Sequence, residues 1–222
     1  MFDARGLIDL LIMGWMSNVP LAVGSVLTLA VFFDRIKKFR GLEARSRDLA
    51  SRVIKTLTQS DLAGAQRLCE ESTIPMARIL GEALRWQNIA VEDYDRVLTT
   101  LRAEAGTESR RGIWIIGTVG SLAPFVGLFG TVVGIIRAFG DLAQEGGAGG
   151  FELVAASLSE ALIATAAGLG VAIVALALYN YLNTRVSALV AIYARGAERL
   201  VQAIIFVEAR SAGADPSSDG SV

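Results

Sequence analysis

The stretch ALIATAAGLGVAIVALALYNYLNT, residues 161–184, contains no charged residue. At a rise of about 1.5 Å per residue, a helix of this length is longer than the roughly 30 Å hydrocarbon core of a bilayer. Two further uncharged runs of similar length occupy residues 10–33 and 112–136. The three runs together predict an all-α integral membrane protein that crosses a bilayer three times.

The composition of the chain excludes several other classes of protein. Hydrophobic residues make up 53% of the 222 residues, and the net charge of -1 gives no reason to expect a nucleic-acid partner. Histidine is absent and Cys69 is the single cysteine, so we expect no intrachain disulfide, no metal site and no cofactor. Because no pairing of a nucleophile with a base is evident, we do not expect an enzyme.

Basic residues cluster at one end of each hydrophobic run. These residues are Arg35, Lys37, Lys38 and Arg40 after the first run, Arg110 and Arg111 before the second, and Arg185, Arg195 and Arg199 after the third. Positive residues favour the cytoplasmic side of a membrane. This pattern predicts an external amino terminus and a cytoplasmic carboxyl terminus. The first run is longer than the apolar part of a signal peptide, so we interpret it as a retained anchor.

The runs and the charges divide the chain into eight segments. We expect three transmembrane helices at residues 10–33, 112–139 and 153–184, with a cytoplasmic helical domain at 34–111 between the first two. The remaining segments are an external amino terminus at 1–9, an external loop at 140–152, a cytoplasmic helix at 185–210 that continues the third span, and a disordered tail at 211–222.

The segment between the first two spans has a helical pattern. Its apolar residues recur at three-, four- and seven-residue steps, beginning with Leu42, Leu49, Val53, Ile54 and Leu57. Ser60 or Asp61 is suited to cap a second helix, and Pro75 to begin a third. A fourth helix is expected to start near Val91 and to run directly into the second span. The segment is therefore predicted to be a helical bundle.

Small residues distinguish the second and third spans from the first. They include Gly127, Gly130 and Gly134 in the second span and Ala164 and Gly168 in the third. Helices associate in lipid through close packing of small residues, so these two spans are predicted to contact other helices. The first span, rich in Leu, Val and Phe, is predicted to face lipid. Pro124 is expected to kink the second span.

Glu160 is an acid next to the uncharged third run, and its depth has two interpretations. If Phe151 marks the outer aromatic belt, Glu160 lies about 13 Å inward from it, where an ionised carboxylate is costly and a proton could be held or exchanged. In the alternative, the span begins only at Ala161, and Glu160 is a solvated acid in the first helical turn, favoured by the helix dipole. The sequence leaves both interpretations open.

Thr131 and Thr165 are hydroxyl residues within the second and third spans. A threonine in a membrane helix commonly donates to a carbonyl of its own helix, three or four residues earlier. Alternatively, the two hydroxyls line a polar path beside Glu160. Ala164 and Gly168 are closer to the face of Glu160 than Thr165 is, and their small size leaves room for another helix there.

Two stretches resemble the TolQ, ExbB and MotA proton-channel family, and most closely its TolQ/ExbB branch. They are LAPFVGLFGTVVGIIRAF, residues 122–139, and SEALIATAAGLGVAIVALALYN, residues 159–180. The resemblance implies that Glu160, Thr131 and Thr165 occupy the proton pathway. It also implies a homo-oligomer, in that branch a pentamer, around two copies of a single-span subunit of the TolR/ExbD kind. That partner carries the membrane aspartate.

The leading hypothesis is therefore a proton-channel subunit of an inner-membrane motor. Such a motor couples proton flow to work on the cell envelope: transport, envelope integrity or gliding motility. The alternative is a non-conducting scaffold that only assembles a membrane complex.

Overall fold

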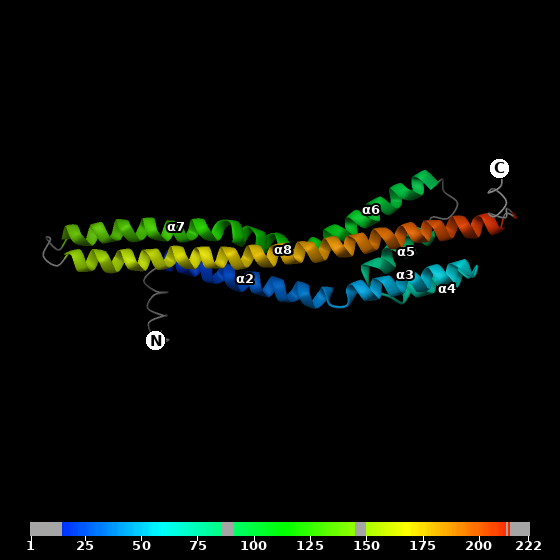
Figure 1. The fold of residues 1–222 in the computed structure, drawn as a ribbon, viewed down its shortest axis with the longest axis horizontal. Helices are drawn as coiled ribbons and strands as arrows, with labels where there is room; N and C mark the ends of the chain where they lie inside the picture. The colour runs from blue at the N-terminus through cyan, green and yellow to red at the C-terminus, as the bar shows by residue number, and fades with distance from the viewer. Residues whose placement is uncertain (1–14, 86–90, 145–149, 212, 214–222) are drawn as a thin grey trace, which may run out of the picture. The chain divides into compact units, whose positions relative to one another are not determined.

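The structure is a computed structural model that describes residues 15–85, 91–144, 150–211 and 213. Within these ranges every regular element is an α-helix. In chain order they are α2 (Trp15–Phe39), α3 (Leu42–Thr58), α4 (Leu62–Glu70), α5 (Pro75–Arg85), α6 (Val91–Arg110), α7 (Ile113–Gln144) and α8 (Gly150–Ser211) (Figure 1). The prediction of an all-α fold is confirmed.

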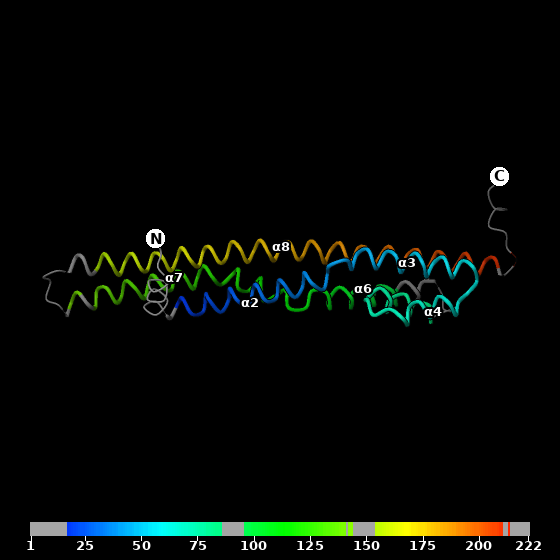
Figure 2. The backbone as a smooth tube through the Cα atoms, turned by 90° about the horizontal axis from the view of Figure 1, so that it is seen from below, coloured from blue at the N-terminus to red at the C-terminus, as the bar shows by residue number. Residues whose placement is uncertain are grey.

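Three of the helices, α2, α7 and α8, contain segments long and apolar enough to cross a membrane. The chain forms two compact units: Met1–Ile36 with Gly112–Asn183, called here the membrane unit, and Lys37–Arg111 with Thr184–Val222, called the helical insert unit. In the membrane unit the three helices lie side by side, with α7 antiparallel to α2 and α8 (Figures 1 and 2). The predictions of three membrane-crossing helices and of a helical region between the first two are both confirmed.

Helices α7 and α8 approach each other most closely at two glycines. A Cβ atom built on Gly168 would lie 2.6 Å from the carbonyl oxygen of Ala123 and 2.9 Å from Cα of Gly127. A Cβ atom built on Gly127 would lie 3.0 Å from the carbonyl oxygen of Ala164 and from Cα of Thr165. Since these neighbours are backbone atoms, which cannot move aside as a side chain can, a side chain at either position would push the two helices apart.

The first membrane helix, α2, contributes little buried surface to this pair. Leu21 packs with Ala123 of α7 and Ala172 of α8 in a small buried cluster. A larger number of apolar residues on α2 are exposed, among them Val19, Val23, Val26, Leu27, Leu29 and Phe33. An apolar surface of this extent is not stable in water, so lipid or other protein chains must cover it.

In the helical insert unit, α3, α4 and α5 pack against one another, and α6 contacts α5. The predicted apolar positions Leu42, Leu49, Val53 and Leu57 are buried. Of the two candidates for the cap of α4, Asp61 performs this role, because its Oδ1 accepts a hydrogen bond of 2.8 Å from the backbone N–H of Gly64. Pro75 begins α5 as predicted.

Two glycines in left-handed conformation interrupt the helices. Gly41, with φ of 71°, separates α2 from α3, and Gly112, with φ of 80°, separates α6 from α7. The expectation that the fourth helix of the insert would run directly into the second span is therefore wrong. Gly112 follows the basic pair Arg110 and Arg111, which is a common sequence at a helix carboxyl terminus.

The long helix α8 carries one buried stripe along most of its length. The stripe consists of Ala161, Ala164, Gly168, Ala172, Ala175, Tyr179, Leu182, Val186, Leu189, Tyr193, Gly196, Leu200 and Ala203, of which only Tyr179 is partly exposed. From its first residue to its last it advances 42 positions in twelve steps, a mean of 3.5 residues per step. A period of 3.5 favours left-handed coiling with neighbouring helices. The prediction that the third span continues as a long helix is confirmed.

Some expectations concern residues outside the described ranges. They are the external amino terminus at 1–9, the first part of the span at 10–33, the glycine-rich part of the loop at 140–152, and most of the tail at 211–222. Gly140 to Gln144 belong to α7, and α8 begins at Gly150, so the described ends of that loop are helical.

A comparison of two glycines tests the close approach of α7 and α8. We expect Gly168→Ala to reduce the free energy of unfolding by about 1–3 kcal/mol, the usual range for an overpacked core, because the new methyl group meets the backbone of α7. Gly170→Ala is the matched control, since a Cβ atom there meets nothing within 4 Å. Thermal unfolding of the purified protein in detergent measures both. Equal midpoints for the two variants would show that the helices are not in close contact at Gly168.

Candidate functional site

Glu160 lies well inside helix α8. The helix begins at Gly150, so ten residues precede Glu160, a rise of about 15 Å. The acid is therefore not in the first turn of the helix, and the favourable helix dipole near an amino terminus, which fades within the first turn, does not reach it. The interpretation that placed Glu160 in the first helical turn is therefore wrong about its position in the helix. The Glu160 side chain is partly buried, and its depth in a bilayer stays a prediction.

Small residues bring α7 close to α8 beside Glu160. Ala161, the next residue, is buried, and its Cβ would lie 2.6 Å from a Cβ built on Gly134. One turn further along, the Cβ of Ala164 would lie 3.1 Å from a Cβ built on Gly130. Gly130, Gly134 and Ala164, all predicted as packing residues, therefore lie at the contact between these two helices. The same is true of Gly127 and Gly168.

The two threonines make different hydrogen bonds. The Thr131 hydroxyl donates to the carbonyl of Leu128 in its own helix at 2.7 Å, as the own-helix interpretation expects. The Thr165 hydroxyl donates across the helix contact to the carbonyl of Gly127 at 2.9 Å, so that interpretation is wrong for Thr165. Thr165 reaches this acceptor because Gly127 has no side chain in between. Its hydroxyl thus links α8 to α7.

The site residues occupy neighbouring levels of the α7–α8 contact. Thr131 lies on α7 between Gly127, which contacts Thr165, and Gly134, which contacts Ala161 beside Glu160. Among the described residues, no hydrogen bond joins Glu160 to either threonine. The arrangement supplies one carboxylate and two hydroxyl groups on neighbouring turns of the two helices, and each hydroxyl already donates to a backbone carbonyl.

Helix α7 continues on both sides of Pro124. Since proline has no N–H group, the carbonyl of Gly120 lacks its usual donor four residues later. A kink at Pro124 stays a prediction.

Ser17 is a polar residue near the site that the sequence argument did not single out. It is 3% exposed, and its Oγ would lie 2.7 Å from a Cβ built on Gly130. The first membrane helix therefore brings a hydroxyl group to α7 one residue before Thr131. The available signal was the polar pair Ser17 and Asn18 within an otherwise apolar run.

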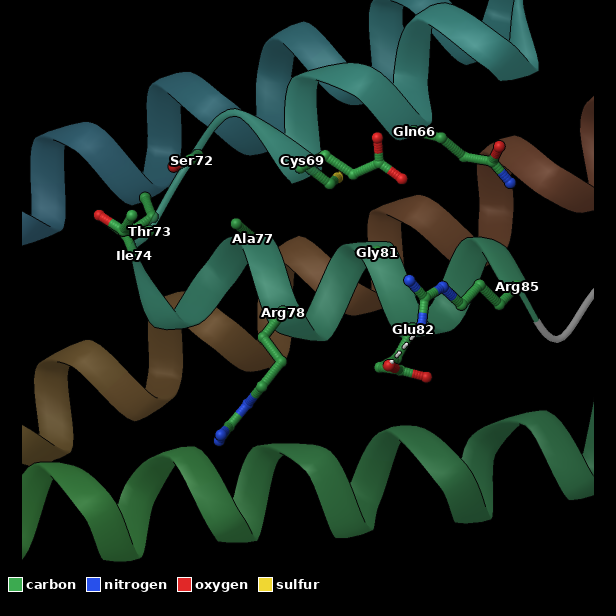
Figure 3. A pocket seen from close by; sticks show the side chains of 11 residues that line it. Gln66, Cys69, Ser72, Thr73, Ile74, Ala77, Arg78, Gly81, Glu82 and Arg85 are labelled. Atoms are coloured by element: carbon green, nitrogen blue, oxygen red, sulfur yellow. Dashed lines mark hydrogen bonds and ion pairs between the residues drawn. The ribbon is translucent and has the colours of Figure 1, made fainter.

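A cavity of about 310 Å³ in the helical insert unit contains the single cysteine of the chain. Figure 3 shows Gln66 and Cys69 of α4 on one side of it and Arg78, Glu82 and Arg85 of α5 on the other. Arg85 pairs with Glu82 at 3.1 Å, and Arg78 with Glu108 at 3.3 Å. Burial raises the pKa of the Cys69 thiol to about 11, and the neighbouring Glu70 carboxylate adds to this effect. The thiol is therefore protonated at neutral pH and is a poor nucleophile.

The family of the chain follows from comparison with known proteins. Residues 71–195, which include α7 and the part of α8 that carries Glu160 and Thr165, match the MotA/TolQ/ExbB proton channel family. The chain belongs to this family.

Three relatives agree with the family match. The chain is 31% identical over 179 residues to an ExbB-like biopolymer transport protein of Synechocystis sp., covering 79% of this chain and 70% of that protein. It is 33% identical over 175 residues to the biopolymer transport protein ExbB of Salmonella typhimurium, covering 73% and 69%. A third relative, ExbB of Pseudomonas putida, is 29% identical over 171 residues, and the match spans about half of its length, 51%.

Membership of the MotA/TolQ/ExbB proton channel family, together with the three apolar helices, makes the chain a multi-pass protein of the inner membrane. The family is one of channel and transport subunits. The expected resemblance to its TolQ/ExbB branch is confirmed, and these relatives are ExbB or ExbB-like proteins.

The hydrogen bond between α8 and α7 leads to a stability prediction. We expect Thr165→Val to reduce the free energy of unfolding by about 0.6 kcal/mol, the average measured for hydrogen bonds between membrane helices, because valine keeps the shape and removes the donor. Thr165→Ser should restore most of the loss. Denaturation of the purified protein by sodium dodecyl sulfate measures the change. Thr131→Val, which removes a bond within one helix, is the control, and a larger loss there would contradict the prediction.

The environment of Cys69 leads to a kinetic prediction. With a pKa of about 11, the folded protein should react with iodoacetamide at pH 8 about two orders of magnitude more slowly than an ordinary thiol with a pKa near 8.5, because only the thiolate reacts. Mass spectrometry follows alkylation without ambiguity, since the chain has one cysteine. The rate should keep rising up to pH 10 for the folded protein and level off above about pH 9 for the unfolded one. Identical pH profiles for the two states would contradict a raised pKa.

Proposed function

We propose that this chain is the proton-channel subunit of an inner-membrane motor that couples proton motive force to work on the cell envelope. The observation that carries the proposal is the position of Glu160. It is a partly buried carboxylate ten residues inside α8, beside the close contact with α7. An acid within a transmembrane helix is costly and is usually functional.

In this proposal Glu160 accepts and releases the proton, and Thr131 and Thr165 supply hydroxyl groups along the path. A hydroxyl group donates one hydrogen bond and accepts others, so each threonine can accept a bond from a passing water or acid while it donates to its carbonyl. The Thr165 bond to Gly127 holds one of these hydroxyls at the α7–α8 contact.

The basic residues support one orientation of the chain. Arg35, Lys37 and Lys38 follow the apolar part of α2, and Arg110 and Arg111 directly precede α7. By the positive-inside rule the helical insert unit and the carboxyl terminus are cytoplasmic, and the amino terminus is periplasmic.

The exposed apolar surface of the membrane unit supports assembly with other chains. Large side chains on α7, including Phe125, Phe129 and Ile136, are at least half exposed. In the proposed complex, copies of this chain form a homo-oligomer, a pentamer in the branch that the sequence resembles. The oligomer surrounds two copies of a single-span partner whose membrane aspartate exchanges protons with the path. Lipid covers the outer surface.

The names of the relatives favour one of the three envelope processes. The Synechocystis, Salmonella and Pseudomonas proteins are each named for biopolymer transport. Among transport, envelope integrity and gliding motility, we therefore propose energised transport as the task of this chain.

A non-conducting scaffold remains the second candidate, because one observation favours it. Gly127 and Gly168 are fully explained by contacts within a single chain, without any path for protons. A scaffold needs these glycines and does not need the acid. The two functions therefore differ in what they require of Glu160.

Replacement of Glu160 separates a channel from a scaffold. In a host strain that lacks its own copy, we expect Glu160→Gln to abolish the proton influx that the wild-type chain supports, because glutamine keeps the shape but cannot take up a proton. A pH-sensitive fluorescent protein in the cytoplasm follows the influx after an external acid shift. Glu152→Gln, an acid in the first turn of α8, is the matched control and should conduct as the wild type does.

Membrane levels of each variant are compared by immunoblot, so that loss of protein is not mistaken for loss of conduction. If Glu160→Gln conducts like the wild type at equal protein level, the channel proposal fails and the scaffold is supported.

A further inference from the structure

A second cavity in the helical insert unit is a groove of about 550 Å³ between α3 and α8. Four basic side chains line it: Arg47 and Lys55 from α3, and Arg195 and Arg199 from α8. No acidic residue is among its lining residues. The groove is of the size that binding sites for ligands commonly have.

The acids that adjoin Arg47 and Arg199 in the sequence contact other arginines. Asp48 pairs with Arg52 at 2.9 Å, and Glu198 lies 3.8 Å from Arg102. Arg47 has only a long contact of 3.9 Å with Glu43. Among the residues that the structure describes, no carboxylate pairs with Lys55, Arg195 or Arg199. The groove therefore concentrates positive charge that nothing in the described chain neutralises.

The floor of the groove is apolar and closely packed. Met76, Ile192 and Ala50 are at most 6% exposed. Gly196 lets α8 approach this floor, because a Cβ atom there would collide with the methyl group of Met76. Ile54, the one predicted apolar position of α3 that is only partly buried, faces this groove. An apolar group of a ligand would find a hydrophobic surface between the basic residues.

The geometry favours an extended anion over a single phosphate group. Arg47 and Lys55 are eight residues apart on one helix, about 12 Å along its axis. Arg195 and Arg199 are one turn apart, about 6 Å. Charges over such a length match several anionic groups in a row.

The groove also lacks the usual features of a nucleotide site. Its charged residues lie beyond the first turn of their helices, where backbone N–H groups are already bonded and cannot cradle a phosphate. It contains no aromatic residue on which a base could stack. Guanidinium groups, in contrast, pair well with carboxylates through two parallel hydrogen bonds.

We propose that this groove binds an acidic segment of a partner polypeptide, in which carboxylates flank an apolar side chain. The carboxylates pair with Arg47, Lys55, Arg195 and Arg199, and the apolar side chain lies on the floor near Met76 and Ile54. Laying a peptide in the groove between two helices is a common mode of recognition. The residues of the groove belong to the helical insert unit, whereas Glu160 belongs to the membrane unit.

Fluorescence anisotropy tests the proposal with a fluorescein-labelled peptide made of repeated Glu-Glu-Leu units. The full-length chain is purified in a neutral detergent and titrated at low salt. We expect saturable binding that weakens about tenfold in the double variant Arg195→Glu with Arg199→Glu, because two attractive contacts become repulsive. A peptide with serine in place of leucine should bind several-fold more weakly.

Two exposed arginines of the same unit provide the matched control. Arg45→Glu with Arg67→Glu changes the net charge by the same amount outside the groove. It should alter the affinity less than threefold. An equal loss of peptide affinity in both double variants would overturn the proposal, since electrostatic attraction to the net charge of the protein would then explain the binding.

Competition by two phosphate-bearing ligands tests whether the groove binds phosphate groups instead of an acidic peptide. Pyrophosphate or phosphatidylglycerol vesicles that displace the peptide at matched charge concentration would assign the groove to phosphate groups and overturn the proposal. If the charge-reversal variant fails to fold, as shown by a shifted gel-filtration profile, Arg195→Ala with Arg199→Ala replaces it, with an expected loss of about fivefold. No binding by the wild-type chain would also overturn the proposal.

Discussion

The backbone contact between α7 and α8 at Gly127 and Gly168 is the constraint on which the membrane unit depends. It sets the distance between the two helices to one that admits no side chain. At that distance Thr165 reaches the carbonyl of Gly127, and Ala161 packs against Gly134 beside Glu160. If the helices lay further apart, the hydrogen bond would break, and side chains would have to fill the space between the two backbones. The proposed proton site is thus a consequence of how closely two backbones can approach.

The buried stripe of α8 changes its composition along the helix, as the proposed passage of the helix from lipid into water would require. Between Ala161 and Ala175 the stripe consists of alanine and glycine, whereas from Leu182 to Leu200 it consists mainly of leucine, valine and tyrosine. In lipid, burying a large apolar side chain gains little, so contacts there depend on close packing. In water, burying such a side chain is the main source of stability. One helix therefore uses two packing strategies.

Local patterns in the sequence predicted where the helices lie. Contacts between residues far apart in the chain could not be predicted in this way. The three spans follow from uncharged runs, and the starts of α4 and α5 from Asp61 and Pro75, all of which are local signals. The acceptor of the Thr165 hydroxyl depends on how near another helix lies, which no local pattern encodes. The break at Gly112 did have a local signal, a glycine after two arginines, and the hydrophobic pattern on both sides concealed it. The basic groove joins residues more than a hundred positions apart in the chain, so spacing along the sequence could not reveal it.

The continuity of α8 restricts how this protein can change length during evolution. At Gly41 and Gly112 the helices already end, so an added or deleted residue there is absorbed by a turn. Within the packed part of α8 in either unit, one inserted residue would rotate the following residues of that unit by about 100° and turn their buried side chains toward the outside. Only changes of about seven residues, two steps of the stripe, keep the buried residues of that unit on one face of the helix. Among related chains, insertions should therefore concentrate at the glycine turns, while the length of α8 varies in whole heptads.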